Sequence, residues 1–310
     1  MTTPTTRPLK VGIQLPEVER EVRWPELLDM IRAIEDVGFD SIWVGEHLLY
    51  RWADRPEAAG PWEAWSMLAA IGAVTQRVEF GPLVACTTFH NPALLAKQAS
   101  TIDEISGGRL ILGLGAGWNE TEFRAFGFPF DHRVDRFEEA FTIIRTLLRE
   151  GAIDFDGRFY QARDCELRPR GPRPNGPPLL IGSNGPRMLR ITMPHADSWN
   201  SWYADIDNAP AGVARLRDVV DAACHDVGRD PADIERTVAV HVRMPGGTGR
   251  LQGGYAEAGA PPLEGDPAAM ADTLRAFAAE GIGHVQLVVD PITRASVEAL
   301  VPVLRTLDGG

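Results

Sequence analysis

A glutamate and a histidine stand where a predicted strand ends. Residues 41–44 (SIWV) are β-branched and aromatic, which is typical of a buried strand, and Glu46 and His47 follow almost directly. A histidine in this place can act as a general acid or base, or can hydrogen-bond a ring carbonyl. The alternative is a histidine that caps the next helix or lies at the rim. We take Glu46 and His47 as the candidate catalytic residues.

A glycine-rich segment, GLGAGWN at 113–119, is a candidate binding site. It resembles a phosphate-binding loop, but its spacing is G-x-G-x-G and the third glycine of G-x-G-x-x-G is missing. We expect its glycines to let a flat ligand approach the backbone closely. Asn119 and Glu122 predict a capping box for a short helix at 121–126. The candidate binding residues here are Gly115, Ala116, Gly117 and Trp118.

The segment GSNGPR at 182–187 lies between a predicted strand and a predicted helix, where an anion can bind. Free backbone N–H groups at a helix start attract negative charge, and the Ser183 hydroxyl and the Arg187 guanidinium add donors. An ordinary capped helix is the alternative, and barrels more often bind phosphate after strands 7 and 8. The candidate residues are Gly182, Ser183, Asn184, Gly185 and Arg187.

Tryptophans gather at or near the ends of predicted strands. They are Trp43, Trp118, Trp199 and Trp202. Indole rings can form the wall of a site for a planar ligand, although we expect Trp43 and Trp199 to be buried in the core. Cys86 lies near the end of the third predicted strand, where it could line a pocket. A small buried apolar role is the favoured interpretation of this cysteine.

Alternating strands and helices must position these residues. Apolar patterns predict eight strands, each followed by a helix. The strands are expected at 10–15, 41–44, 77–85, 109–115, 179–182, 197–200, 236–242 and 284–289. The helices are expected at 24–37, 61–74, 92–106, 134–149, 186–193, 209–227, 266–280 and 293–306. This count of βα units predicts an α/β fold, a single (β/α)8 TIM-barrel domain over 1–310, with its site at the carboxyl ends of the strands.

Two insertions interrupt the pattern. After the helix that follows strand 4, residues 153–160 (IDFDGRFY) hold Asp156-Gly157 between strand-like residues, which predicts a β-hairpin. A run rich in proline and glycine follows at 169–178. After strand 7, residues 244–267 are rich in glycine and proline, and they form either a lid over the site or a passive surface loop.

Composition argues against several classes of protein. The 310 residues carry a formal charge of −12, which disfavours nucleic acid or an anionic membrane as a partner. No segment has the length of an apolar membrane span, and the N-terminus has no apolar leader. The three cysteines lack a C-x-x-C, and zinc-binding H-E-x-x-H, P-loop and G-x-S-x-G motifs are missing. We expect a cytoplasmic protein without a metal site.

In order along the chain, four segments resemble the bacterial luciferase-like superfamily of flavin- and deazaflavin-dependent oxidoreductases. They are FDSIWVGEHL (39–48), HNPALLAKQASTIDEISGGRLILGLGAGWNETEFRAFG (90–127), PPLLIGSNGPRMLRI (177–191) and HADSWN (195–200). Members are (β/α)8 barrels that bind FMN or coenzyme F420 at the carboxyl ends of the strands. The resemblance therefore implies an oxidoreductase with one of these cofactors.

The resemblance also implies roles for residues. His47 would lie near the isoalloxazine ring, and the segment 83–88 would pass under the ring, often through a cis non-prolyl peptide bond. In that segment the cofactor-binding residues would be Val84, Ala85 and Cys86. Residues 115–118 would lie beside the cofactor, and residues 182–186 would receive its phosphate. Luciferases carry a reactive cysteine on strand 4, where this chain has Gly115, so light emission is not expected.

The two cofactors imply two reactions. With reduced FMN and O2, we expect a two-component monooxygenase that acts on a small organic substrate and obtains reduced flavin from a separate reductase, because no NAD-binding segment is visible. With F420, we expect hydride transfer by a dehydrogenase or reductase. The acidic chain favours FMN over the polyglutamate tail of F420, whereas residues 90–127 resemble F420-dependent members. A non-catalytic cofactor-binding barrel is a third alternative, and a homodimer is implied by the resemblance.

Overall fold

The strands form a parallel barrel, described by a computed structural model over residues 7–52, 57–248 and 260–309. Within these residues nine strands make one sheet, in the order β3-β2-β1-β11-β10-β9-β8-β5-β4. Its strands are β1 (Lys10–Gln14), β2 (Ser41–Val44), β3 (Glu79–Pro82), β4 (Ala85–Cys86), β5 (Leu112–Gly115), β8 (Leu179–Ile181), β9 (Ser198–Ser201), β10 (Glu235–Arg243) and β11 (His284–Asp290). Ile111, just before β5, donates its N–H to the carbonyl of Phe80 in β3 at 2.8 Å. This contact closes the barrel.

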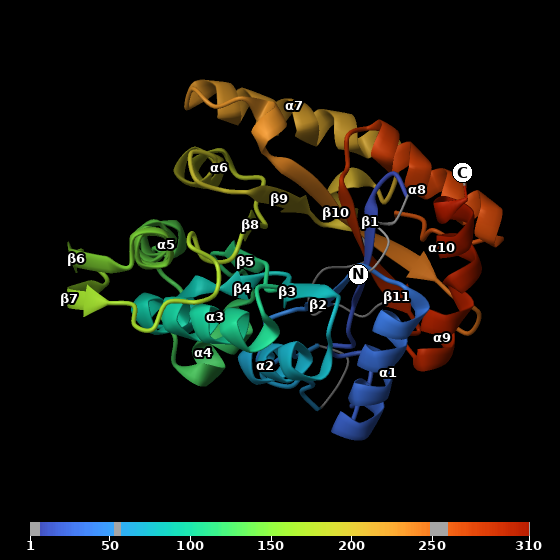
Figure 1. The fold of residues 1–310 in the computed structure, drawn as a ribbon, viewed down its shortest axis with the longest axis horizontal. Coiled ribbons are helices and arrows are strands. Elements are labelled where there is room, and N and C mark those ends of the chain that lie inside the picture. The colour runs from blue at the N-terminus through green and yellow to red at the C-terminus, as the bar shows by residue number, and fades with distance from the viewer. Residues whose placement is uncertain (1–6, 53–56, 249–259, 310) are drawn as a thin grey trace.

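Helices cover the outside of the barrel (Figure 1). They are α1 (Trp24–Val37), α2 (Ala64–Val74), α3 (Pro92–Ser106), α4 (Glu120–Phe126), α5 (Arg133–Glu150), α6 (Pro186–Thr192), α7 (Pro210–Asp226), α8 (Pro267–Ala279), α9 (Arg294–Ala299) and α10 (Val301–Asp308), with short 3-10 turns at η1 (Thr87–Phe89), η2 (Tyr203–Ile206) and η3 (Pro231–Asp233). Because helices cover one face of each strand and the barrel interior the other, β2 and β11 are buried along their whole length.

The predicted (β/α)8 barrel is confirmed, with two differences in its elements. The predicted strand 77–85 is divided into β3 and β4 by a cis peptide bond between Leu83 and Val84. That bond lies inside the segment in which the resemblance implied one. The predicted helix 293–306 is divided into α9 and α10, because Pro302 has no N–H with which to continue the hydrogen bonds of α9.

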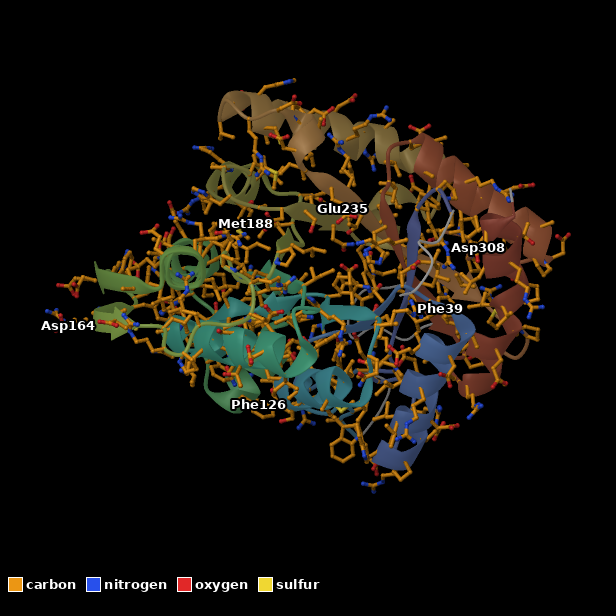
Figure 2. The ribbon with its side chains drawn as sticks, viewed as in Figure 1. Phe39, Phe126, Asp164, Met188, Glu235 and Asp308 are labelled. Atoms are coloured by element: carbon orange, nitrogen blue, oxygen red, sulfur yellow. The ribbon has the colours of Figure 1, made fainter. Side chains whose placement is uncertain are left out.

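The insertion after α5 is the predicted hairpin. Strands β6 (Ala152–Asp156) and β7 (Gln161–Glu166) pair antiparallel, and Figure 2 shows Asp164 of β7 at the outer edge of the molecule. The Glu139 carboxylate on α5 accepts backbone N–H groups from the connecting loop, from Arg158 at 2.8 Å and from Phe159 at 2.8 Å. These bonds fasten the hairpin to the barrel helices.

The insertion after β10 is described only at its two ends, because residues 249–259 of the predicted loop 244–267 lie outside the described residues. Its returning end runs beside β10, where Arg243 donates its N–H to the carbonyl of Leu263 at 3.0 Å. Whether the loop is a lid or a passive surface segment stays a prediction.

Three expected absences can be compared with the part of the chain that the structure describes. No described helix is long and apolar enough to cross a membrane. No described group of three or more His, Cys, Asp or Glu side chains is arranged to hold a metal ion. The three cysteines, all described, are free thiols.

Candidate active site

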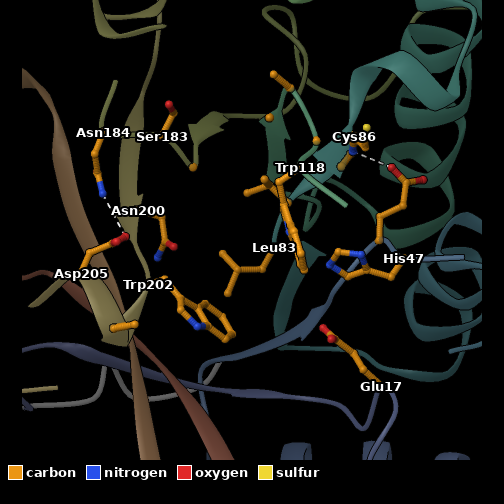
Figure 3. Close-up of a pocket in the computed structure, with 18 of the residues that line it drawn as sticks. Glu17, His47, Leu83, Cys86, Trp118, Ser183, Asn184, Asn200, Trp202 and Asp205 are labelled. Carbon is orange, nitrogen blue, oxygen red and sulfur yellow. Dashed lines mark hydrogen bonds between the residues drawn. The ribbon is translucent and has the colours of Figure 1, made fainter. Parts of the chain in front are cut away.

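At the carboxyl ends of the strands the barrel encloses a cavity of about 430 Å³ (Figure 3). This volume falls in the range of small-molecule sites. The candidate residues that line it are Glu46, His47, Val84, Ala85, Cys86, Gly115, Ala116, Gly117, Trp118, Gly182, Ser183 and Asn184. Gly185 and Arg187 are not among its lining residues. Segments far apart in the sequence meet here because parallel strands end at the same edge of the barrel.

His47 is held by a carboxylate from a distant helix. Its Nδ1 lies 3.0 Å from Oε1 of Glu122 on α4. Because a carboxylate only accepts hydrogen bonds, Nδ1 carries a proton, and Nε2 is the nitrogen available to a ligand in the cavity. The other oxygen of Glu122 accepts the N–H of Leu48 at 2.8 Å. Glu122 therefore fixes both the ring and the backbone that carries it.

The predicted capping box at the start of α4 is wrong. Asn119 makes no side-chain cap; its amide instead donates to the carbonyl of Leu49 at 3.0 Å. Glu122 bonds His47 rather than the N–H of its own helix start. The polar residues of the motif thus connect α4 to the segment after β2. This long-range contact forms in place of the local cap.

Carboxylates around His47 favour its protonated form. Burial lowers the pKa of His47, but the hydrogen bond to Glu122 and the charges of Glu17 and Glu46 outweigh this, so the pKa lies above its ordinary value of 6.5. The ring also packs against aromatic side chains, with centroids 4.7 Å from Tyr50 and 5.6 Å from Trp118. His47 can therefore donate a proton from Nε2 into a partly apolar cavity.

Glu46 is engaged on both carboxylate oxygens. Oε1 accepts from Trp65 Nε1 at 2.8 Å and lies 2.7 Å from His90 Nε2, and Oε2 accepts the backbone N–H of Cys86 at 2.7 Å. These contacts connect the ends of β2 and β4. Glu46 lines the cavity, and its bonds are those of a residue that positions the cavity wall.

Glycines at the strand ends leave room for the protein's own side chains. Gly115 and Gly117 also line the cavity, and close approach of a flat ligand to them stays a prediction. A Cβ at Gly115 would lie 2.8 Å from Val84, and one at Gly182 would lie 2.9 Å from the same side chain. A Cβ at Gly117, whose φ is +75°, would lie 2.4 Å from the sulfur of Cys86. Close approach between strand ends, with Val84 between Gly115 and Gly182, explains these glycines.

The Cys86 thiol is buried at the edge of the cavity. Burial, and then the charge of Glu46, raise the pKa of Cys86 well above its usual value. Its side chain packs with a cluster of aromatic rings that includes Phe89 and Phe123. The expected small apolar role of this residue agrees with its burial of all but 4% of its surface.

The segment 182–187 is only partly directed at the cavity. Asn184 donates to the Asp205 carboxylate at 2.9 Å (Figure 3). Arg187 pairs instead with two carboxylates of α5, Asp135 and Glu138. Gly182, Ser183 and Asn184 thus line the cavity, while the Arg187 guanidinium is directed to α5.

The tryptophans separate as expected into core and site. Trp43 and Trp199 are buried, with at most 1% of their surface exposed. Trp118 and Trp202 line the cavity, and Figure 3 shows both rings at its walls. These two rings give the cavity flat apolar surfaces.

Several lining residues are not among the candidate catalytic or cofactor-binding residues named from the sequence. They are Gln14, Glu17, Tyr50, Glu122, Asn200 and Asp205. Gln14 and Glu17 lie at the carboxyl end of the predicted first strand, so their position at a strand end was a usable signal. Glu122 gave no such signal, because it lies on a helix and reads as a capping residue.

The fold and site define a class, the (β/α)8 barrels that bind a small molecule at the carboxyl ends of their strands. A family model described as luciferase-like monooxygenase matches residues 9–244. The chain belongs to this family, and we place it among the luciferase-like oxidoreductases.

Curated relatives include both expected kinds of enzyme. The chain is 30% identical over 239 residues to the 5,10-methylenetetrahydromethanopterin reductase of Archaeoglobus fulgidus, across 72% of this chain and 67% of the relative. It is 33% identical over 214 residues to an F420-dependent glucose-6-phosphate dehydrogenase of Intrasporangium calvum, across 63% of each chain. It is 32% identical over 175 residues to the pyrimidine monooxygenase RutA of a Caulobacter strain, across 55% of this chain and 48% of the relative. The matches thus span from about half to two thirds of the relatives' length.

Solved structures share the whole fold. An F420-dependent secondary alcohol dehydrogenase in complex with an F420-acetone adduct superposes with a TM-score of 0.80 at 20% identity, covering 96% of this chain and 99% of that one. The oxygenating constituent of 3,6-diketocamphane monooxygenase from Pseudomonas putida, in complex with FMN, gives 0.71 at 17% identity, covering 97% and 96%. At these identities the likeness shows the fold.

The residues present fit a cofactor such as FMN or F420. Asn184 Oδ1 is buried and accepts no hydrogen bond from the described residues. Together with the Ser183 hydroxyl it offers polar partners for the ribityl hydroxyls that both cofactors carry. The flat walls of Trp118 and Trp202 suit a planar ring.

Proposed function

We propose that the protein is a two-component monooxygenase that uses reduced FMN and O2 to oxidise a small organic substrate. The proposal rests on how charges are distributed at the end of the cavity where Asn184 lies. Asn184 is bonded to Asp205, and Arg187 is paired with Asp135 and Glu138. Because Asn184 is neutral and the charge of Arg187 is compensated by two carboxylates, this end suits a single phosphate better than an oligoglutamate tail.

In this proposal the cofactor occupies the cavity between two strand ends, and the chain holds and orients it. Val84, Ala85 and Cys86 on one side and residues 115–118 on the other flank the ring, while residues 182–185 receive the phosphate at the start of α6. Reduced FMN, when bound, supplies the electrons that activate O2. The rings of Trp118 and Trp202 keep water from the reacting atoms.

We assign the proton chemistry to His47. Glu122 holds Nδ1, and the raised pKa favours a protonated ring that donates from Nε2 toward a ligand. A positioned acid of this kind stabilises negative charge that develops on a reacting oxygen. Glu46, bonded to Trp65 and Cys86, holds the wall beside it.

Oxygen consumption tests this proposal. Protein supplied with chemically reduced FMN and a panel of small organic compounds is expected to consume O2 and to transfer one oxygen atom to a compound, traced with ¹⁸O2. If no compound gains ¹⁸O and the protein leaves the oxidation of free reduced FMN unchanged, the monooxygenase proposal fails.

A second candidate is an F420-dependent dehydrogenase or reductase, favoured by the F420-dependent relatives. His47 would then act as the acid or base at the substrate oxygen while a hydride moves to or from the cofactor. A change in the absorbance of F420 during turnover of an alcohol or carbonyl substrate, measured without O2, distinguishes this reaction from the first.

We also propose a separate flavin reductase as partner, because no NAD-binding segment is visible in the sequence, and a homodimer, which rests on the resemblance. The three free thiols support a reducing compartment such as the cytoplasm. Size-exclusion chromatography with light scattering tests the dimer.

A further inference from the structure

One corner of the cavity holds two polar side chains that the mechanism above does not use. Gln14, the last residue of β1, and Glu17, just after it, both line the cavity beside His47. Gln14 is 1% exposed and Glu17 is 7% exposed. In Figure 3 the carboxylate of Glu17 lies on the same side of the cavity as the His47 ring, opposite Asn184 and Asp205.

The contact between them fixes the orientation of the Gln14 amide. Gln14 Nε2 donates to Glu17 Oε1. Because a carboxylate has no proton to donate, the amide nitrogen must face Glu17 and the amide oxygen must face away from it. That oxygen, Oε1, is buried and accepts no hydrogen bond from the residues that the structure describes. A buried acceptor without a donor is unfavourable unless a ligand or water completes it.

The chain makes room for the Glu17 carboxylate at Gly45. A Cβ at Gly45 would lie 1.8 Å from Glu17 Oε1, so no other residue type fits there without displacing the carboxylate. The position of Glu17 is therefore built into the turn after β2. Its charge is also one of those that raise the pKa of His47, which places it close to that ring.

The cavity as a whole is acidic. Its lining carboxylates are Glu17, Glu46, Glu122 and Asp205. Among the described residues that line it there is no lysine or arginine. An anionic group entering this corner would face Glu17 and the Gln14 carbonyl, and among the described lining residues His47 is the one cationic side chain that would attract it.

We propose that Gln14 and Glu17 form a substrate subsite for a hydrogen-bond donor that is not an anion, a hydroxyl or an amine, held beside His47. Gln14 Oε1 and the Glu17 carboxylate both accept, and the walls of Leu83 and Trp202 contact an apolar body attached to the donor. The subsite thus selects alcohols and amines and rejects carboxylates and phosphates. It rests on the proposed function only in taking this cavity as the substrate site, and it holds for either cofactor.

Four matched compounds test the subsite without any cofactor: benzylamine, benzyl alcohol, benzyl methyl ether and benzoate. Saturation-transfer NMR with the whole protein measures their affinities. We expect the amine and the alcohol to bind about tenfold more tightly than the ether and benzoate, the size of a charge-assisted hydrogen bond. Gln14→Leu and Glu17→Gln are expected to remove most of this preference. Glu104→Gln makes the same charge change on an exposed part of α3 and is the matched control. This variant is expected to keep the preference for the amine and the alcohol.

Each outcome decides the proposal. Benzoate or the ether binding as tightly as the amine to the wild-type protein would overturn it, and so would a preference that survives in both variants. Failure of all four compounds to bind would also overturn it. Thermal melting verifies that the variants fold, and Glu17→Asp, which keeps the charge, is expected to restore amine binding. If Gln14→Leu instead abolishes FMN binding, Gln14 belongs to the cofactor and the subsite is refuted. If FMN and F420 both fail to bind while the ranking holds, the proposed function fails and the subsite stands.

Discussion

His47 and Glu122 are separated by 75 positions in the chain and by 3.0 Å in space. The strand-end position of His47 could be predicted from the apolar run before it. Its partner could not, because the same spacing of Asn119 and Glu122 also predicts a capping box, and only the closed barrel brings α4 against the segment after β2. The partners of Arg187 could not be predicted for the same reason, because they are carboxylates on α5, a distant part of the sequence.

Replacing His47 tests its role as the acid at the reacting centre. His47→Ala is expected to keep cofactor affinity, because the phosphate and ring contacts lie elsewhere, and to lower kcat by about 10²–10⁴-fold. Steady-state kinetics and a cofactor titration measure the two effects. Unchanged turnover would remove His47 from the mechanism.

Glu122→Gln tests how the histidine is held. Removing the charge of Glu122 leaves only Glu17 and Glu46 to oppose the effect of burial, so the pKa of His47 is expected to fall. NMR titration of the imidazole reports this without any cofactor. Glu122→Asp keeps a carboxylate and should retain part of the raised pKa. A pKa that does not move in Glu122→Gln would show that Glu122 does not set it.

At the scale of elements, short βα units could be predicted because buried parallel strands are almost uniformly apolar. The division of one predicted strand into β3 and β4 was not predicted, although residues 77–85 contain Gly81-Pro82, a pair that interrupts strands. The contacts of Gly115 and Gly182 with Val84 were not predicted either. Pattern alone shows that a glycine permits close approach, but not whether Val84 or a ligand makes it.

Gly117→Ala is expected to destabilise the turn after β5. The substitution forces a left-handed φ of +75° on a residue with a Cβ, and that Cβ would lie 2.4 Å from the Cys86 sulfur. Together these effects should lower the free energy of unfolding by about 2–4 kcal/mol. Gly281→Ala is the control, because its φ is +88° and no atom lies within 4 Å of its Cβ.

That control should lower the free energy of unfolding by only about 1 kcal/mol. Urea unfolding of the two variants measures the difference. Equal losses would mean that contact with Cys86 contributes nothing.

For the whole molecule, a buried histidine at the amino-terminal end of the barrel makes stability depend on pH. Trp43 Nε1 donates to Ser41 Oγ at 2.7 Å, and that hydroxyl lies 2.7 Å from Nε2 of His284, which fits a neutral ring that accepts the hydroxyl proton. Burial, and then the charge of Lys10, lower the pKa of His284 from 6.5 to about 3. Between these values the unfolded chain binds a proton that the folded chain does not.

The contribution of His284 to the free energy of unfolding is therefore fully present above pH 6.5 and is lost as the pH falls toward 3. The expected slope is up to about 1.4 kcal/mol per pH unit. Urea unfolding at pH 7.5, 6 and 5 measures it, and His284→Gln is expected to show a shallower slope. Equal slopes in the two proteins would show that His284 titrates normally.

The central functional claim concerns the opposite end of the barrel, where the cavity is proposed to bind reduced FMN. Anaerobic titration of the purified protein with reduced FMN and, separately, with F420, followed by tryptophan fluorescence, tests it most directly, because Trp118 and Trp202 line the cavity. We predict saturable binding of reduced FMN, tighter than that of F420, and O2 consumption when oxygen is admitted. Binding of F420 alone, with no oxygen uptake in the presence of reduced FMN, would contradict this account.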